Sequence, residues 1–383
     1  MSNIARSMQL LLRLRGASLI PHDCVNLCQL LNGRAAGHQL SLAEWNTVIQ
    51  LARSANVLGI LFHRLDARDE LSKIPSVVQW HLSSAAVIAE KYRRDAVQEV
   101  ERLWPILHAC DQPLILLKGA AYVLGERAFA KGRTFSDIDI LVPKANLSYV
   151  ESQLQWLGWG SSHHSDYDQR YYREWMHELP PLVHAKRGTV LDLHHTILPL
   201  TASLKPDADK LLKEAQAFSE HVSTLSSIDQ VLHTATHLFM DSEFDHAFRD
   251  LLDFDGLMRE LKPDDDLLDQ IIGRAVSLDL LPPLYYAMRY SRLLFETPIP
   301  DSAMLRVSEA WTPKLGTTIM DWLFIPVLLP PHTMYQSSLR AYCANKLLFI
   351  RGHALRMPAH LLIRHLSFKA FVAPFIKEKK PSS

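Results

Sequence analysis

Cysteine is scarce in this sequence, and long hydrophobic runs are absent. The four cysteines are too scattered for a disulfide scaffold and include no Cys-x-x-Cys pair; they are Cys24, Cys28, Cys110 and Cys343. No stretch of about 18 uncharged apolar residues occurs, so no membrane span is predicted. The first twenty residues hold only a three-leucine run before two arginines interrupt it, which makes a poor secretory signal. We therefore expect a soluble, cytoplasmic protein, with peripheral membrane contact as the alternative.

An excess of charge of one sign is also missing. Lys and Arg number 41 and Asp and Glu number 41, so the net charge is zero. Proteins that bind nucleic acid over a whole face need an excess of Lys and Arg, so the sequence disfavours a protein of this class. The charge is unevenly distributed, because residues 331–383 carry nine Lys or Arg and one acidic residue. We expect this basic tail to pack against the acidic remainder of the chain. The alternative is that it contacts an anionic membrane or a polyanion.

Two catalytic signatures are absent as well. The sequence contains neither Gly-x-Ser-x-Gly, typical of serine hydrolases, nor Gly-x-Gly-x-x-Gly, typical of dinucleotide-binding folds. At 383 residues the chain is long enough for two or three units with cores of their own.

The hydrophobic patterning predicts four regions and an α/β (α+β) fold. Residues 1–110 and 201–330 show helical spacing, and residues 331–383 form the basic helical tail. Residues 111–200 predict a small mixed sheet with interspersed helices. Its expected strands are 114–117, 136–142, 181–184 and 189–194, and its expected helices are 120–130 and 147–157.

The segment 136–142, Ser-Asp-Ile-Asp-Ile-Leu-Val, carries the most informative residues. Positions i and i+2 of a strand point to the same face, so Asp137 and Asp139 bring two carboxylates to one place. Asp192, on the strand 189–194, is a third candidate. Carboxylate oxygens are the ligands that Mg²⁺ prefers, and three carboxylates are enough for two metal ions. The alternative interpretation of an Asp-x-Asp pair is that both side chains simply lie on a solvent-exposed face of a strand.

Positive groups for phosphate binding are expected nearby. Lys118 and Gly119 follow the first strand at the start of a helix, where backbone N–H groups favour anions. Arg133, four residues before Asp137, is expected to bind a phosphate or, alternatively, to pair with Asp137. With Ser136 and His194 they complete the expected substrate-binding set, and His194 is expected to orient Asp192 or to touch the acceptor.

Two further histidines, His233 and His237, are four residues apart on a predicted helix, on the side opposite its apolar stripe. We expect them to face a cleft or water. The spacing would suit zinc, but no Glu follows His233, so a metalloprotease helix is disfavoured.

The order Lys118-Gly119, Arg133, Asp137-Ile-Asp139 and Asp192-Leu-His194 resembles the nucleotidyltransferase superfamily with its polymerase-β-like fold. The resemblance is strongest to the uncharacterised nucleotidyltransferase family and extends over about residues 113–256. It implies that Asp137 and Asp139 are ligands shared by two Mg²⁺ ions and that Asp192 holds the ion that activates the acceptor hydroxyl. One departure is Ala120, which stands where the superfamily has a serine that touches the triphosphate.

The resemblance implies Mg²⁺-dependent transfer of a nucleoside monophosphate from an NTP, with ATP the expected donor, to an acceptor hydroxyl with release of pyrophosphate. The alternative is an inactive module that keeps the fold to bind a nucleotide or an anionic partner. A transferase acting on RNA is disfavoured by the neutral charge. The acceptor is not specified by the sequence.

Overall fold

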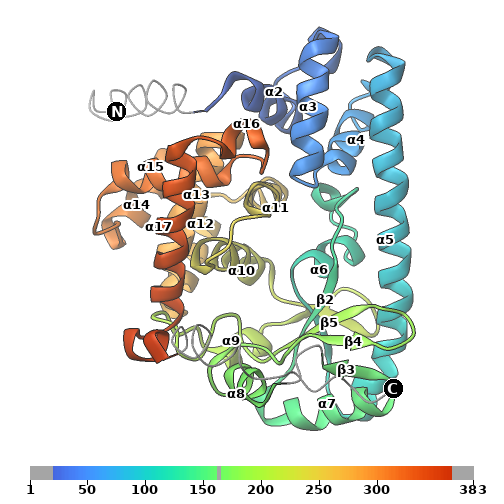
Figure 1. Cartoon of the computed structure of the whole chain (residues 1–383), viewed down its shortest axis with the longest axis vertical. Helices are drawn as coiled ribbons and strands as arrows, with labels where there is room; N and C mark the ends of the chain where they lie inside the picture. The colour runs from blue at the N-terminus through green and yellow to red at the C-terminus, as the bar shows by residue number, and fades with distance from the viewer. Residues whose placement is uncertain (1–19, 162–164, 365–383) are drawn as a thin grey trace.

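The computed structural model of the chain describes residues 20–161 and 165–364. A seven-stranded mixed sheet lies toward one end of the molecule, with the N-terminal helices along one side and the C-terminal helices along the other (Figure 1). The predicted α/β class with helical flanks is therefore confirmed.

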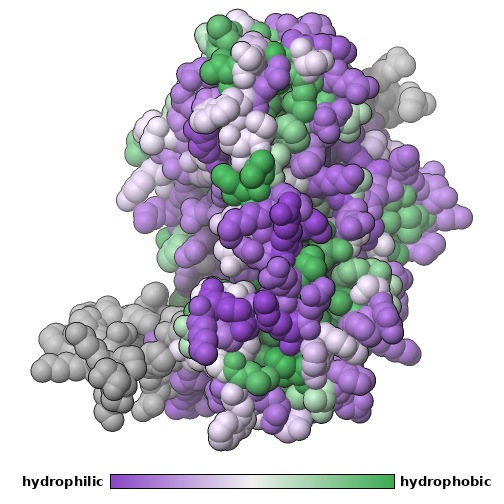
Figure 2. Space-filling model, turned by 90° about the vertical axis from the view of Figure 1, so that its right-hand side faces the viewer, coloured by the Kyte–Doolittle hydropathy of each residue, from purple (hydrophilic) through white to green (hydrophobic). Residues whose placement is uncertain are grey.

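The N-terminal region is helical. Its helices are α2 (His22–Asn32), α3 (Leu42–Ser54), α4 (Leu58–Asp66) and α5 (Ser76–Ala109), with short 3₁₀ turns η1 (Gly37–Gln39) and η2 (Leu71–Lys73). A capping box starts α3, since Ser41 accepts a hydrogen bond from the Glu44 backbone and the Glu44 carboxylate accepts one from the Ser41 N–H. On the face that Figure 2 shows, along α5, hydrophobic residues form separate patches between hydrophilic ones.

The strand order in the sheet is β3-β4-β5-β2-β1-β7-β6. The strands are β1 (Leu114–Leu116), β2 (Asp137–Leu141), β3 (Trp159–Ser161), β4 (Leu182–His184), β5 (Val190–His194), β6 (Gln216–Ala217) and β7 (Val222–Thr224). Strand β2 is central and pairs antiparallel with β1 and parallel with β5. The sheet continues past residue 200, because β7 pairs parallel with β1. Sequence patterning missed β3, β6 and β7, which are too short to show a clear alternation.

The register of β2 against β5 determines where the carboxylates lie. Asp139 pairs with Asp192, and Asp137 pairs with Val190. Paired residues of adjacent strands point to the same side of a sheet, so all three aspartates share one face. The residues adjacent to them in sequence, such as Ile138, Ile140 and Leu191, are buried in the hydrophobic core on the other face.

Several helices connect the strands. They are α6 (Lys118–Leu124), η3 (Ala128–Ala130), η4 (Lys144–Asn146), α7 (Leu147–Trp156), α8 (Asp166–Trp175) and α9 (Ala208–Lys213). Helix α8 was not predicted, because its polar and aromatic sequence has no aliphatic stripe. Its start has a local cause, since the Ser165 hydroxyl accepts a hydrogen bond from the Asp168 N–H at 3.0 Å.

The C-terminal helices pack around α10. They are α10 (Ser227–Met240), α11 (Ala247–Leu261), α12 (Asp265–Ser277), α13 (Leu281–Phe295), α14 (Asp301–Ala310), α15 (Thr317–Leu328), α16 (Thr333–Gln336) and α17 (Leu339–Arg356). Helix α10 contacts α11, α12, α13 and α17, so almost all of its surface is covered. His233 is accordingly buried, which corrects the expectation that it faces a cleft or water. His237, one turn later, does reach the pocket described below.

Part of the basic tail packs on the body of the protein. The Arg351 guanidinium lies over the rings of Tyr286 and Phe324 and donates a hydrogen bond to the Phe239 carbonyl. Arg356 forms a 2.6 Å ion pair with Asp241. The predicted packing therefore holds for these two arginines, while the lysines of residues 365–383 lie outside the described residues. Among the described helices, none has the length and apolar character needed to cross a membrane.

Candidate active site

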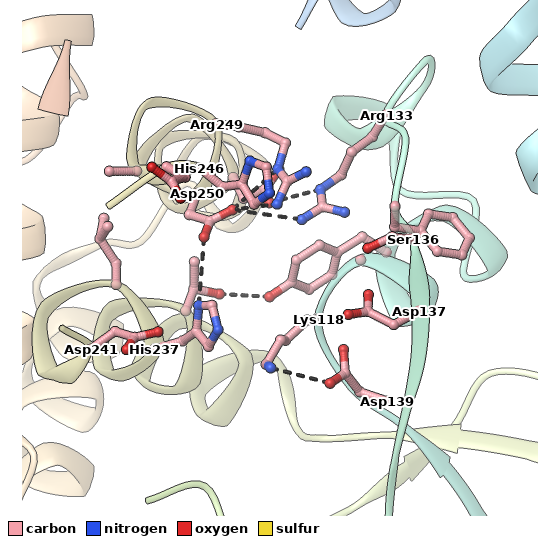
Figure 3. Close-up of a pocket in the computed structure, with 18 of the residues that line it drawn as sticks. Lys118, Arg133, Ser136, Asp137, Asp139, His237, Asp241, His246, Arg249 and Asp250 are labelled. Atoms are coloured by element: carbon pink, nitrogen blue, oxygen red, sulfur yellow. Dashed lines mark hydrogen bonds and ion pairs between the residues drawn. The ribbon is translucent and has the colours of Figure 1, made fainter. Parts of the chain in front are cut away.

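A pocket of about 270 Å³ lies between strand β2 and helices α10 and α11 (Figure 3). Six of the predicted site residues line it: Lys118, Gly119, Arg133, Ser136, Asp137 and Asp139. The opposite wall comes from the second half of α10, the loop after it and α11; among its residues are His237, Asp241, Arg249, Asp250 and Asp253. The other two predicted residues, Asp192 and His194, are not part of the lining and lie beside Asp139 on the adjacent strand β5.

The three carboxylates occupy different environments. In Figure 3, Asp137 and Asp139 extend from β2 on the side that faces Lys118. Asp139 is 4% exposed, whereas Asp137 is half-buried at the pocket surface. The Asp192 side chain has a buried Oδ1 without a hydrogen-bond partner among the described residues. Burial, together with the charges of Asp139 and Glu178, raises the pKa of Asp192 to about 7.

This arrangement fits a divalent cation. Carboxylates crowded on one face repel one another, and the unpartnered oxygen of Asp192 leaves a buried polar group unsatisfied. Mg²⁺ takes oxygen ligands from one or two carboxylates and keeps positions for water and phosphate. Asp137, Asp139 and Asp192 are therefore the residues suited to hold Mg²⁺.

Lys118 lies directly next to the buried carboxylate. Its Nζ is 3.2 Å from Asp139 Oδ1. Burial alone would lower the pKa of Lys118, but the nearby carboxylates, led by Asp139, outweigh burial and raise it. In turn, burial would raise the pKa of Asp139, but Lys118 and His194 hold it well below its usual range. Both groups are therefore charged in the folded protein.

The backbone at Lys118 is unusual. Its φ of 46° lies in the left-handed region, which costs energy for a residue with a side chain and is often found at functional sites. This conformation occurs where β1 turns into α6, at the residue whose side chain reaches Asp139.

Gly119 and Arg133 fit together. A methyl group at Gly119 would overlap the Arg133 guanidinium, so the absence of a side chain makes room for this arginine. Arg133 is 4% exposed, and its Nε donates to Asp253 at 2.8 Å. The alternative in which Arg133 pairs with Asp137 is therefore wrong, because the guanidinium turns toward α11. Arg133 still lines the pocket.

A second arginine was missed by the sequence analysis. The Nε and a terminal nitrogen of Arg249, on α11, lie 3.2 and 3.1 Å from Asp250 Oδ1. Asp250 also approaches Arg133 at 3.9 Å and His237 at 3.5 Å. Burial would raise the pKa of Asp250, but Arg249 and His237 lower it. The signal available in the sequence was weak: two carboxylates three residues apart, Asp250 and Asp253, on a helix predicted only as part of the C-terminal region.

His194 contacts a carboxylate different from the one expected. Its Nε2 lies 2.8 Å from Asp139 Oδ1 and 3.4 Å from Glu178 Oε2, and its exposure is 1%. Burial would lower the pKa of His194, but Glu178 and Asp139 raise it above its ordinary value. Among the described side chains, His194 therefore contacts Asp139 and Glu178 and forms no hydrogen bond with Asp192. Ser136, in contrast, is exposed at the pocket.

The mixed sheet, with its carboxylates facing a pocket that also contains basic side chains, defines a nucleotidyltransferase-type domain. The chain belongs to the uncharacterised nucleotidyltransferase family, which matches residues 41–296, about two thirds of its length. The match includes all of the predicted site residues as well as α10 and α11, and it confirms the resemblance drawn from the motifs. No curated protein and no solved structure shows significant similarity to the chain.

Proposed function

We propose that the protein is a Mg²⁺-dependent enzyme that transfers a nucleoside monophosphate from an NTP, with ATP the expected donor, to the hydroxyl of an unidentified acceptor. The family supports nucleotidyl transfer in general. The observation that carries the more specific proposal is the shared face of Asp137, Asp139 and Asp192 beside a pocket with Lys118 and two arginines.

In this reaction an acceptor oxygen forms a bond to the α-phosphorus, the bond from that phosphorus to the bridging oxygen breaks, and pyrophosphate leaves. Bound Mg²⁺ would neutralise the triphosphate and favour ionisation of the acceptor hydroxyl. Two ions are expected, with Asp137 and Asp139 as shared ligands and Asp192 as the ligand on the acceptor side. Lys118 then supplies a positive charge for the phosphates next to Asp139.

Arg133 and Arg249 are the candidates for binding the far end of the triphosphate. Each guanidinium has five N–H donors, and the carboxylates of Asp253 and Asp250 occupy only some of them. Those carboxylates also fix the arginine side chains, so little side-chain entropy is lost when phosphate binds. The missing serine at Ala120 is compatible with this arrangement, since the pocket holds three cationic side chains.

The proposed setting is the cytoplasm. Cys24, Cys28, Cys110 and Cys343 are all free thiols, which a reducing compartment would maintain. Contact of the basic tail with a polyanion or membrane is an additional proposal, which concerns mainly residues 365–383.

Label transfer tests the proposal. The full chain is incubated with each α-labelled NTP, Mg²⁺ and fractionated cell extract as a source of acceptors, and labelled product and pyrophosphate are measured together. We expect equal amounts of both, and the loss of both in Asp137→Asn/Asp139→Asn. The matched control is Asp95→Asn, which removes an exposed carboxylate of α5. Nucleotide binding without transfer in any fraction would favour the inactive binding module instead.

A further inference from the structure

Two histidines and a glutamate converge beside Asp139, outside the pocket. Glu178 Oε2 lies 3.7 Å from His177 Nε2 and 3.4 Å from His194 Nε2. One ligand atom from each of the three residues lies within 4.8 Å of the other two. None of the three residues lines the pocket of about 270 Å³.

The backbone holds this cluster in place. Glu178 and His194 form an antiparallel bridge, and the His195 N–H donates to the His177 carbonyl at 2.9 Å. The ring centroids of His177 and His194 are 5.3 Å apart. Because residues 177–179 run along the end of β5, the three side chains are positioned before any ligand arrives.

The spacing of the ligand atoms suits a small tetrahedral ion. Ligands at about 2.1 Å from a tetrahedral Zn²⁺ are about 3.4 Å from each other. The two distances to Glu178 are close to this value. Three protein ligands leave the fourth tetrahedral position to water.

The ligand types separate this cluster from the magnesium site. Imidazole nitrogens favour Zn²⁺ and related transition metals, whereas Mg²⁺ favours oxygen.

We propose that His177, Glu178 and His194 bind a divalent transition-metal ion of the Zn²⁺ type. Coordination through Nε2 would replace the 2.8 Å hydrogen bond between His194 Nε2 and Asp139 Oδ1. The proposal does not depend on nucleotidyl transfer, because two of its ligands, His177 and Glu178, belong to no part of the proposed reaction.

Metal titration of the full chain tests this site. The protein is stripped with a chelator and titrated with Zn²⁺ by calorimetry in excess Mg²⁺, which occupies the carboxylate site. We expect one Zn²⁺ per chain and an affinity at least about tenfold lower in His177→Ala. His360→Ala removes an exposed histidine and should leave the affinity unchanged.

Two further variants keep the result interpretable. His177→Gln preserves much of the side-chain volume, and circular dichroism shows whether each variant is folded. Substitution with Co²⁺ adds a spectroscopic readout, since tetrahedral coordination with nitrogen ligands gives intense visible bands that His177→Gln should lose. Asp137→Asn should retain the Zn²⁺ site although it loses the magnesium site.

Three results would overturn the proposal: no Zn²⁺ binding by the wild-type chain, equal binding by folded His177→Ala, or binding that disappears only in Asp137→Asn. The last result would mean that Zn²⁺ simply enters the carboxylate site. Mg²⁺-dependent nucleotide binding is measured on the same variants, so failure of the transition-metal site and failure of the proposed function are distinguishable.

Discussion

Replacing Asp192 with asparagine should stabilise the metal-free protein at alkaline pH. The pKa of this carboxyl is raised from an ordinary value of 3.8 to about 7, mainly by burial and then by Asp139 and Glu178. The folded state therefore holds a proton on Asp192 more tightly than the unfolded state does. Its contribution to stability is fully present below about pH 4 and is lost as the pH rises through about 7.

The size of the effect follows from the same values. At about 1.36 kcal/mol per pKa unit, the difference between 3.8 and about 7 corresponds to about 4 kcal/mol. This is an upper value, because asparagine at this position must also find hydrogen-bond partners. Above about pH 8, Asp192→Asn should thus increase the free energy of unfolding by up to about 4 kcal/mol, and the gain should shrink to near zero at about pH 4.

Urea unfolding in chelator at several pH values measures this difference. Added Mg²⁺ should stabilise the wild-type protein and stabilise Asp192→Asn much less, because the variant lacks one ligand. If Asp192→Asn changed stability by the same amount at every pH, the carboxyl would not be titrating between the two states. Burial and the neighbouring carboxylates would then not raise the pKa of Asp192.

Three other substitutions test the pocket and the tail. Gly119→Ala should push the Arg133 guanidinium out of place, cost about 1–3 kcal/mol in urea unfolding and weaken nucleotide binding; unchanged affinity would exclude a phosphate contact by this arginine. Lys118→Ala should weaken NTP binding about 10- to 100-fold in calorimetry, since a charged hydrogen bond contributes about 1.5–3 kcal/mol, and an unaltered Kd would restrict Lys118 to its ion pair. Arg356→Ala should cost at most about 1 kcal/mol of unfolding free energy, because its ion pair with Asp241 is partly exposed; a much larger loss would mean that α17 depends on this contact.

The carboxylate face could be predicted from the sequence because strand periodicity is a local property. Asp137 and Asp139 are two residues apart, so β2 places them on one face independently of the tertiary structure. The turn at Lys118 and Gly119 was predicted in the same way, since a short apolar run ended there. The strand pattern of 189–194 also made Asp192 a candidate, but it could not show that Asp192 pairs with Asp139, because these residues are more than fifty positions apart.

The partners of the basic residues could not be predicted. Arg133 binds Asp253, 120 residues later, and only the packing of α11 against the sheet brings them together. Arg249 and His237 enter the pocket for the same reason.

The cluster of His177, Glu178 and His194 also depends on tertiary structure. It forms because an irregular segment after α8 runs beside the end of β5. The polar sequence of this segment has no hydrophobic periodicity from which its position could be predicted.

The most direct test of the central claim is calorimetric titration of the protein with nonhydrolysable analogues of the four NTPs. We predict binding of at least one analogue that requires Mg²⁺ and disappears in Asp137→Asn/Asp139→Asn, while Asp95→Asn binds as the wild type does. Absence of binding for all four analogues, or binding that persists without Mg²⁺ and without both aspartates, would contradict a metal-dependent nucleotide site on β2.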